Sequence, residues 1–176
     1  MSHKEVIKAI KGDEEAFESL IKEEGDKMYK TAFLYVRNKD DALDVVQETV
    51  TKAFISIHQL KKPELFSAWL MKILIHTAYD LLHKKNKVVL TDNFSSFKGE
   101  QRVGHEEKLD LLSAISKLTH NYKTVIILFY FQDQSIKSIS ESMDKPEGTI
   151  KTYLHRAKSE IKKLLGGVDL DEKRMV

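Results

Sequence analysis

Apolar residues recur every three or four positions along most of this chain, which is the spacing that places side chains on one face of an α-helix. Proline, which interrupts helices, occurs only twice in the 176 residues, and glycine occurs seven times. Few positions therefore break the apolar runs. The pattern predicts an all-α protein, and its length suits one medium-sized domain or two small ones.

The first half of the chain predicts a bundle of four helices. Their expected ranges are 4–24, 26–37, 41–60 and 64–85. Gly25 is expected to end the first helix, and Asn38–Asp40 to form a turn that caps the third. Pro63 suits the start of the fourth.

A polar stretch, LTDNFSSFKGEQRVGHE (90–106), separates the two halves of the chain. It contains two glycines and shows no sustained apolar period, which is typical of a linker. We therefore divide the chain into an N-terminal helical bundle (1–88), a flexible linker (89–106) and a second, smaller helical domain (107–176).

The second domain contains a helix-turn-helix pattern. The run YKTVIILFYF (122–131) is apolar on almost all sides, which predicts a buried central helix. Ser135 is expected to cap a short helix, and a turn at Asp144–Lys145 leads to the basic segment PEGTIKTYLHRAK (146–158). Pro146 suits the first helical position, with Asp144 or Lys145 as the cap. Two helices joined by a tight turn, the second of them basic, favour DNA binding.

This last helix has two faces. One is an apolar stripe that should pack into the domain: Ile150, Leu154, Ala157 and Ile161. The other carries groups that neutralise phosphates or reach base edges in a major groove: Lys151, Thr152, His155 and Arg156. A solvated amphipathic helix shows the same periodicity, so the DNA-binding interpretation depends on the preceding short helix and turn.

Aromatic and cationic residues interleave on one stripe of the fourth predicted helix. The members of the stripe are Trp69, Lys72, His76, Tyr79, His83 and Lys87. Rings of this kind can stack on unpaired bases while ammonium groups follow the phosphates. For Trp69 the alternative is burial in the core of the bundle.

The third predicted helix, DALDVVQETVTKAF (41–54), has an acidic outer side. Its broad inner face is expected to include Val45, Ala53 and Phe54, whereas Asp44, Gln47 and Glu48 lie outside. Acidic residues near a helix start are stabilised by the helix dipole, which accounts for Asp44. Gln47 and Glu48 lie further in and fit a protein-contact surface equally well.

Catalytic and metal-binding signatures are missing from the sequence. There is no cysteine, so disulfides and cysteine-ligated zinc are excluded. The sequence has no phosphate-binding glycine loop, no dinucleotide motif and no His-Glu-x-x-His zinc motif. His76 and Asp80 stand four residues apart without an evident third metal ligand. We expect no cofactor, no metal, no small-molecule substrate and no enzymatic activity.

The expected compartment is the cytoplasm. No apolar run has the length needed to span a membrane. The N-terminal segment MSHKEVIKAIKGDEE is too highly charged for a signal peptide.

Three segments, in this order, resemble the extracytoplasmic-function (ECF) group of RNA polymerase sigma factors in the sigma-70 family. DALDVVQETVTKAF resembles the second conserved region, and WLMKILIHTAYDLLHKK resembles the promoter-melting segment. The stretch from LTHNYK to AKSEI (118–161) resembles the promoter-reading C-terminal domain. The resemblance covers roughly 17–85 and 109–165.

The resemblance implies a role for each segment. Asp44, Gln47 and Glu48 would contact the clamp coiled coil of the largest subunit of core RNA polymerase, whose flap is a further expected contact. Lys151, Thr152, His155 and Arg156 would read the −35 element of promoter DNA. The residues implied in recognising and melting the −10 element are Lys61, Lys62, Leu65, Trp69, Lys72, His76, Asp80 and Lys84.

The family also implies control by an anti-sigma factor, often membrane-anchored, in a stress or cell-envelope response. Five positions depart from the usual pattern. They are Leu43, His76, Ser138, Ser140 and Asp144, which stand where Glu, Asn, Glu, Ala and Gly are common. His76 leaves the −10 base preference open.

Two rival hypotheses remain at this point. A helix-turn-helix regulator with a sensory N-terminal domain would bind duplex DNA specifically by itself, whereas a sigma factor would need core polymerase. A helical adaptor between proteins would show no salt-sensitive DNA binding.

Overall fold

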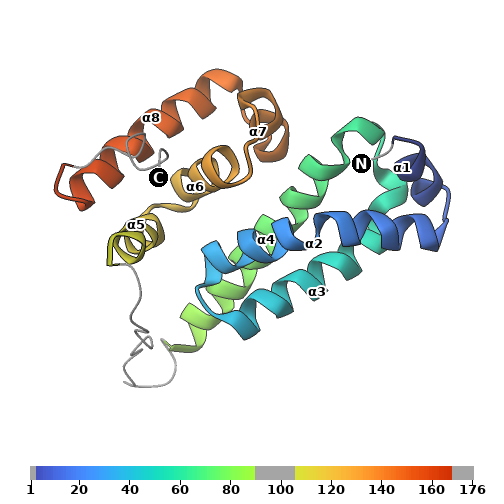
Figure 1. Ribbon diagram of the computed structural model, residues 1–176, viewed down its shortest axis with the longest axis horizontal. Coiled ribbons are helices and arrows are strands. Elements are labelled where there is room, and N and C mark those ends of the chain that lie inside the picture. The colour runs from blue at the N-terminus through green and yellow to red at the C-terminus, as the bar shows by residue number, and fades with distance from the viewer. Residues whose placement is uncertain (1–2, 90–105, 168–176) are drawn as a thin grey trace.

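The computed structural model describes the backbone of residues 3–89 and 106–167 and the side chains of 3–85 and 111–167. Within these ranges every regular element is a helix, and the helices form two domains (Figure 1). The all-α prediction is therefore confirmed. Residues 90–105 of the expected linker and residues 168–176 lie outside the described part of the chain.

The N-terminal domain is built on three long helices that pack side by side. They are α2 (Glu14–Val36), α3 (Lys39–Ser56) and α4 (Phe66–Val89), preceded by the short α1 (His3–Ile10) (Figure 1). Two 3₁₀ turns, Ile57–Gln59 and Pro63–Leu65, connect α3 to α4. The side chains of Leu20, Met28, Phe66 and Leu70 are fully buried between these helices.

The break between the first two helices falls earlier than predicted. Gly12, at a φ of 95°, ends the turn after α1, and the Asp13 carboxylate caps α2 by accepting the Ala16 N–H at 3.0 Å. Gly25 lies inside α2, so its prediction as a helix end was wrong. A glycine costs a helix about 1 kcal/mol, and the burial of Leu20 and Met28 on either side offsets that cost. Asn38 does cap α3, accepting the Asp41 N–H at 3.0 Å.

Helix α4 is more apolar than the sequence analysis allowed. Over Pro63–Lys85 it is long and apolar enough to cross a membrane by length and composition alone. In the fold, the side chains of Phe66, Leu70 and Leu74 are fully buried among α2, α3 and α4. A central position in the bundle accounts for the apolar composition of this helix.

Over residues 106–167, the described part of the C-terminal domain, the chain forms four helices and a π-helical turn. The helices are α5 (Glu106–Lys117), α6 (His120–Ile126), α7 (Ile136–Met143) and α8 (Glu147–Leu164). The π-helical turn, Ile127–Phe131, continues α6. The predicted buried run is confirmed from Thr124 to Leu128, but Phe131 is exposed.

The helix-turn-helix forms as predicted, with one correction at the start of its second helix. The Ser135 hydroxyl caps α7 by accepting the Ser138 N–H at 3.1 Å, and Asp144 takes the left-handed conformation in the turn. The cap of α8 is Pro146 itself, whose carbonyl accepts the Thr149 and Ile150 N–H groups at 2.9 and 3.1 Å. Neither Asp144 nor Lys145 supplies a side-chain cap, because Pro146 already fixes an extended entry to the helix.

The two domains pack against each other. Helices α5 and α7 and the π-helical turn contact α2 or α4, whereas α8 lies on the outer side of its domain (Figure 1). The apolar cores of the two domains join into one cluster of buried residues. This packing places α7 against the N-terminal half of α4, which includes residues predicted to contact DNA.

Candidate nucleic-acid interface

The exposed side of α8 carries all four residues that were predicted to read duplex DNA. Ile150, Leu154, Ala157 and Ile161 are buried in the domain, as the periodicity required. Lys151, Thr152, His155 and Arg156 are exposed on the opposite side. The Thr152 hydroxyl donates to the Gly148 carbonyl oxygen at 2.9 Å. This bond fixes the orientation of the Thr152 side chain in the first two turns of α8.

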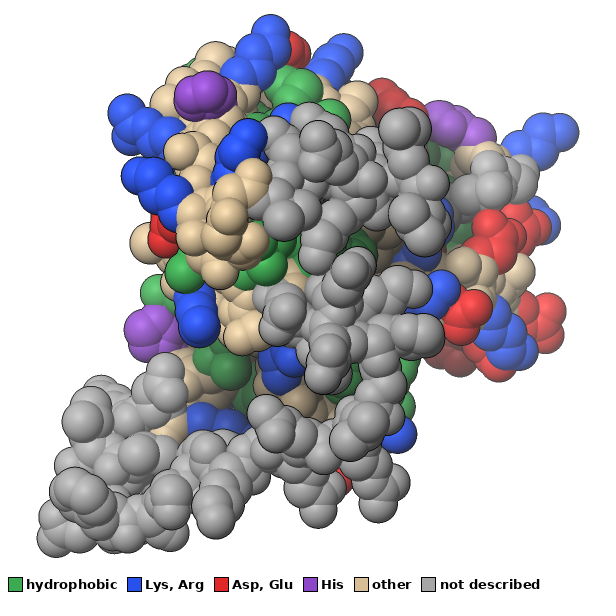
Figure 2. Space-filling view, turned by 60° about the vertical axis from the view of Figure 1, so that its left-hand side comes forward, with side chains coloured by type: hydrophobic (Ala, Val, Ile, Leu, Met, Phe, Trp, Pro, Cys, Tyr) green, Lys and Arg blue, Asp and Glu red, His purple; other side chains and the backbone are tan. Residues whose placement is uncertain are grey.

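Basic side chains are unevenly distributed on the surface. Figure 2 shows lysine and arginine side chains gathered along one side of the upper part of the molecule, whereas acidic and basic side chains mix at the opposite edge. An uneven distribution of this kind concentrates positive potential where a polyanion can bind.

The residues predicted to recognise the −10 element are spread along α4 and the loop before it. Lys61 and Lys62 are exposed in the loop, and Leu65 is half-buried at the end of the 3₁₀ turn. His76, Asp80 and Lys84 are exposed further along α4. These six residues extend from the loop before α4 to Lys84 near its end, so they do not form one compact site.

Among the described residues, Trp69 and Lys72 are two predicted −10 residues whose side chains pack or pair with other residues of the fold. Trp69 is half-buried with its ring centroid 5.9 Å from that of Phe66, so it has a place in the core and still reaches the surface. The Lys72 ammonium group pairs with the carboxylate of Asp144, which belongs to the turn between α7 and α8. In this arrangement the C-terminal domain therefore occupies one of the predicted DNA contacts.

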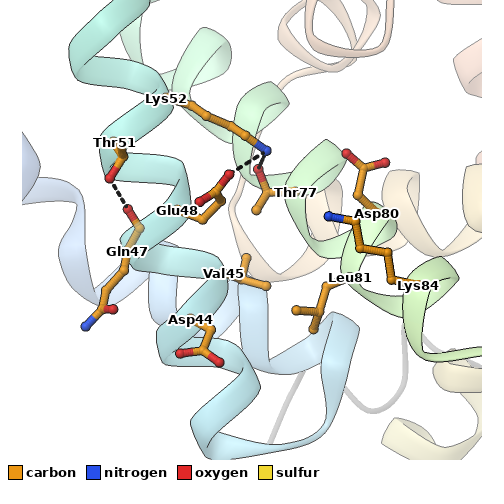
Figure 3. A pocket seen from close by; sticks show the side chains of 10 residues that line it. All are labelled: Asp44, Val45, Gln47, Glu48, Thr51, Lys52, Thr77, Asp80, Leu81 and Lys84. Carbon is orange, nitrogen blue, oxygen red and sulfur yellow. Dashed lines mark hydrogen bonds and ion pairs between the residues drawn. The ribbon is translucent and has the colours of Figure 1, made fainter. Parts of the chain in front are cut away.

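A groove of about 500 Å³ lies between α3 and α4 and joins two predicted surfaces (Figure 3). Asp44, Gln47 and Glu48, the predicted polymerase contacts, form its α3 side, and Asp80 and Lys84 form its α4 side. The sequence did not predict this groove, because spacing along one helix does not specify which neighbouring helix it faces.

Lys52 bridges the two sides of the groove. Its ammonium group is 3.2 Å from the Glu48 carboxylate and donates to the Thr77 hydroxyl at 3.2 Å (Figure 3). Glu48 is therefore partly neutralised within the fold, whereas the side chain of Gln47 points away from α4 (Figure 3). Of the three predicted polymerase contacts, Asp44 and Gln47 are the better presented to a partner.

Large apolar side chains are exposed on the same helix. Leu43 is 51% and Ile55 is 67% exposed. Phe54, predicted to face inward, is 49% exposed and packs edge-on against Phe17 with ring centroids 5.2 Å apart. Helical periodicity predicted Phe54 to face inward because the apolar stripe of this helix is broad. Only the packing of neighbouring helices shows which residues at the edge of the stripe are buried. Apolar groups beside acidic ones are typical of a protein-contact surface.

The seam between the domains holds polar side chains that sequence reasoning missed. The Tyr35 and Thr124 hydroxyls are 2.5 Å apart and buried, and this burial raises the pKa of Tyr35 well above its ordinary value. Burial also lowers the pKa of Lys123, and the charge of Arg37 lowers it further. Tyr35 and Thr124 are 89 residues apart, so no local signal connects them.

The chain was compared with known protein families and proteins. The family model "Sigma-70 region 2" matches residues 20–88, and "Sigma-70, region 4" matches residues 108–161. The RNA polymerase sigma factor SigV of Bacillus subtilis (strain 168) is 41% identical over 130 residues, which is 73% of this chain and 78% of SigV. The ECF RNA polymerase sigma factor SigW of the same strain is 28% identical over 181 residues, covering 94% of this chain and 97% of SigW.

Solved structures share the fold. CnrH, in complex with the cytosolic domain of CnrY, matches with a TM-score of 0.74 at 21% identity, covering 93% of this chain and 96% of CnrH. The sigma factor RpoE of Bartonella quintana, in complex with the anti-sigma factor NepR, matches with a TM-score of 0.69 at 23% identity, covering 85% of this chain and 96% of RpoE. Both family regions, in order on one chain, and the similarity to SigV and SigW show that this chain belongs to the ECF group of RNA polymerase sigma factors.

Proposed function

We propose that this chain binds core RNA polymerase and directs it to a specific set of promoters under the control of an anti-sigma factor. The observation that carries the proposal is the presence of both sigma-70 regions on one chain, with an exposed basic face on α8 and an acidic and apolar face on α3. The rest of the proposal assigns a step of initiation to each of these faces.

The outer side of α3 docks on the polymerase. Asp44 and Gln47 meet the clamp coiled coil of the largest subunit, with Glu48 at the edge of the contact, and the C-terminal domain meets the flap. Leu43 adds an apolar contact beside these polar ones, since half of its surface is exposed. Charged groups at such a rim mainly accelerate association, whereas apolar groups slow dissociation.

The −35 element is read by α8 in the major groove. Lys151 neutralises a phosphate and fixes the register, while Arg156, His155 and Thr152 reach base edges or the neighbouring backbone. This placement agrees with the general geometry of helix-turn-helix proteins, in which the second helix of the motif enters the groove.

The −10 element is melted and held by α4 and the preceding loop. Lys61, Lys62 and Lys84 follow the phosphates, while Trp69 and His76 offer rings to unpaired bases. Leu65, Lys72 and Asp80 complete the surface. Extruding a base costs on the order of a few kcal/mol, which stacking and pocket contacts offset.

The chain itself performs no chemistry in this proposal. The polymerase forms the phosphodiester bonds, and the sigma factor contributes recognition and strand separation without a cofactor or small-molecule substrate. The protein works in the cytoplasm, and an anti-sigma factor, anchored in the membrane, holds it inactive until a stress or cell-envelope signal arrives. The solved complex of RpoE with the anti-sigma factor NepR supports control by an anti-sigma partner, and membrane anchoring is a further part of the proposal.

Transcription by purified core polymerase on a genomic promoter library, with and without this chain, tests the proposal. We expect a defined set of transcripts that share −10 and −35 sequences and appear only when the chain is present. Specific binding to duplex DNA without polymerase would instead favour the regulator hypothesis. Absence of both promoter-dependent transcripts and salt-sensitive DNA binding would favour the adaptor.

A further inference from the structure

An aromatic stack crosses the seam between the two domains. The ring centroid of Tyr79, on α4, is 4.2 Å from that of His83 on the same helix and 4.2 Å from that of His120 on α6. His120 is half-buried and lies 6.3 Å from the ring of Tyr35 on α2. One histidine of the C-terminal domain is therefore held between two helices of the N-terminal domain.

Further hydrogen bonds cross the seam and hold the domains together. Besides the buried contact between Tyr35 and Thr124, the Gln132 amide donates to the Thr31 hydroxyl at 2.7 Å. The Ser142 hydroxyl lies 3.3 Å from the Ala68 carbonyl oxygen. Together with the Lys72–Asp144 pair, these contacts keep the C-terminal domain on the side of α4 that carries Lys72, one of the proposed −10 contacts.

Among the described residues, the groups whose charge acts on His120 are all bases, and the phenol rings of Tyr79 and Tyr35 also face it. The bases are His76 and His83 from α4 and Lys123 from α6, while Arg37, at the end of α2, acts on Lys123. The described side chains of α5 (111–117) contribute none of these groups. Burial lowers the pKa of His120 below its ordinary value of 6.5, and repulsion from these neighbouring groups lowers it further.

We propose that this seam is a proton-sensitive latch, in which the neutral His120 ring holds the C-terminal domain on α4 and protonation of that ring releases it. A proton on His120 places a positive charge beside Lys123, on a ring that is half-buried in the seam. The statement that release exposes a −10 contact rests on the proposed function. The latch itself is a property of the isolated chain.

The direction of the pH effect follows from linkage. The closed form binds fewer protons than the open form, because the pKa of His120 is lowered only while the seam is intact. The closed form is thus fully favoured above about pH 6.5 and loses stability as pH falls below that value. The ratio of open to closed molecules should rise about tenfold for each pKa unit by which closure depresses His120.

Fluorescence energy transfer within the isolated chain tests the latch. Because the natural chain has no cysteine, Glu15→Cys and Lys163→Cys give one dye position in each domain, both on exposed residues. We expect transfer to fall reversibly between about pH 8 and about pH 5.5 while far-ultraviolet circular dichroism stays constant. His120→Gln should abolish the response and remain closed, whereas His120→Lys should be open across the range.

His58→Gln is the matched control, since this exposed histidine lies on the 3₁₀ turn after α3, outside the seam. It should respond to pH like the parent chain. A parent chain with constant transfer, a His120→Gln variant with the full response, a His58→Gln variant without it, or helix loss in the same pH window would each overturn the latch. None of these results would affect promoter-dependent transcription, so the latch and the proposed sigma function fail separately.

Discussion

The hydroxyl groups of Tyr35 and Thr124 meet at 2.5 Å in the buried seam between the two domains. The two hydroxyl groups differ in their other hydrogen-bond partners. The Thr124 hydroxyl also donates to the His120 carbonyl oxygen of its own helix at 2.9 Å. Tyr35, whose side chain is buried, has no such second acceptor among the hydrogen bonds of the described residues.

Removing either partner should therefore have an unequal effect on stability. Thr124→Val leaves the Tyr35 hydroxyl buried without its partner, and we expect a loss of about 1–3 kcal/mol in the free energy of unfolding. Tyr35→Phe leaves Thr124 bonded to its own helix, and about 0.5–1.5 kcal/mol should be lost. Urea denaturation of both variants measures the difference. A larger loss for Tyr35→Phe would contradict this account of the seam.

The double variant separates the pair from its surroundings. If the two hydroxyls interact directly, the loss in Tyr35→Phe combined with Thr124→Val should be smaller than the sum of the single losses, because the second substitution no longer leaves an unpaired group. Additive losses would mean that each residue contributes only through its own packing.

Local features of the fold could be predicted from the sequence because they depend on neighbouring residues. The two faces of α8 follow from helical periodicity, and Ser135 and Asn38 cap helices through bonds to residues three positions ahead. Features that depend on distant packing could not be predicted. Gln132 meets Thr31 across 101 residues, and the groove between Asp44 and Lys84 exists only once α3 lies on α4. Spacing within a helix predicts which side is apolar but not what covers it.

Replacing Gly12 and Gly25 with alanine should change the free energy of unfolding in opposite directions. Gly25 lies inside α2, and beyond its chain neighbours and the backbone of its own helix no atom lies within 4 Å of the position that a Cβ would take, so Gly25→Ala should stabilise the protein by about 0.5–1 kcal/mol. Gly12 has equal space but a φ of 95°, which alanine adopts only with strain, so Gly12→Ala should destabilise it by about 1 kcal/mol or more. Urea denaturation measures both changes in the free energy of unfolding. Stabilisation by both substitutions would contradict the assignment of the helix break to Gly12.

Charge reversal at Asp44 should weaken binding to core polymerase. Asp44→Lys opposes the proposed contact with the clamp, and we expect the association rate to fall on the order of tenfold at low salt, with a smaller effect at high salt. Asp26→Lys is the matched control, because Asp26 is an exposed acid of α2 outside the proposed surface. Biolayer interferometry at two salt concentrations measures both rates. Equal losses in the two variants would indicate a general effect of net charge.

Leu43, the exposed apolar residue next to Asp44, should affect the dissociation rate from core polymerase. Leu43→Ala removes half-exposed apolar surface without touching the core, so the free energy of unfolding should change by less than about 0.5 kcal/mol. If Leu43 packs against the polymerase, dissociation should become faster while association changes little, since apolar contacts form late in docking. An unchanged dissociation rate would show that Leu43 is not part of the contact. A change in the association rate alone would also contradict the prediction, because Leu43 has no charge that could guide association.

Loss of the Arg156 guanidinium should affect promoter choice and leave the fold intact. Arg156 is exposed on α8 opposite the buried Leu154 and Ala157, so Arg156→Ala removes no core contact. If it bonds a base of the −35 element, initiation from promoters that depend on this element should fall by about 1–3 kcal/mol, or roughly 5- to 150-fold, with core binding unchanged. A matched promoter series, altered one base at a time, should show relaxed preference at a single position. If the loss is instead uniform across sequences and the salt slope falls by about one, Arg156 contacts a phosphate. Equal loss of polymerase binding and initiation would contradict both assignments, because it would trace the defect to the structure of the domain.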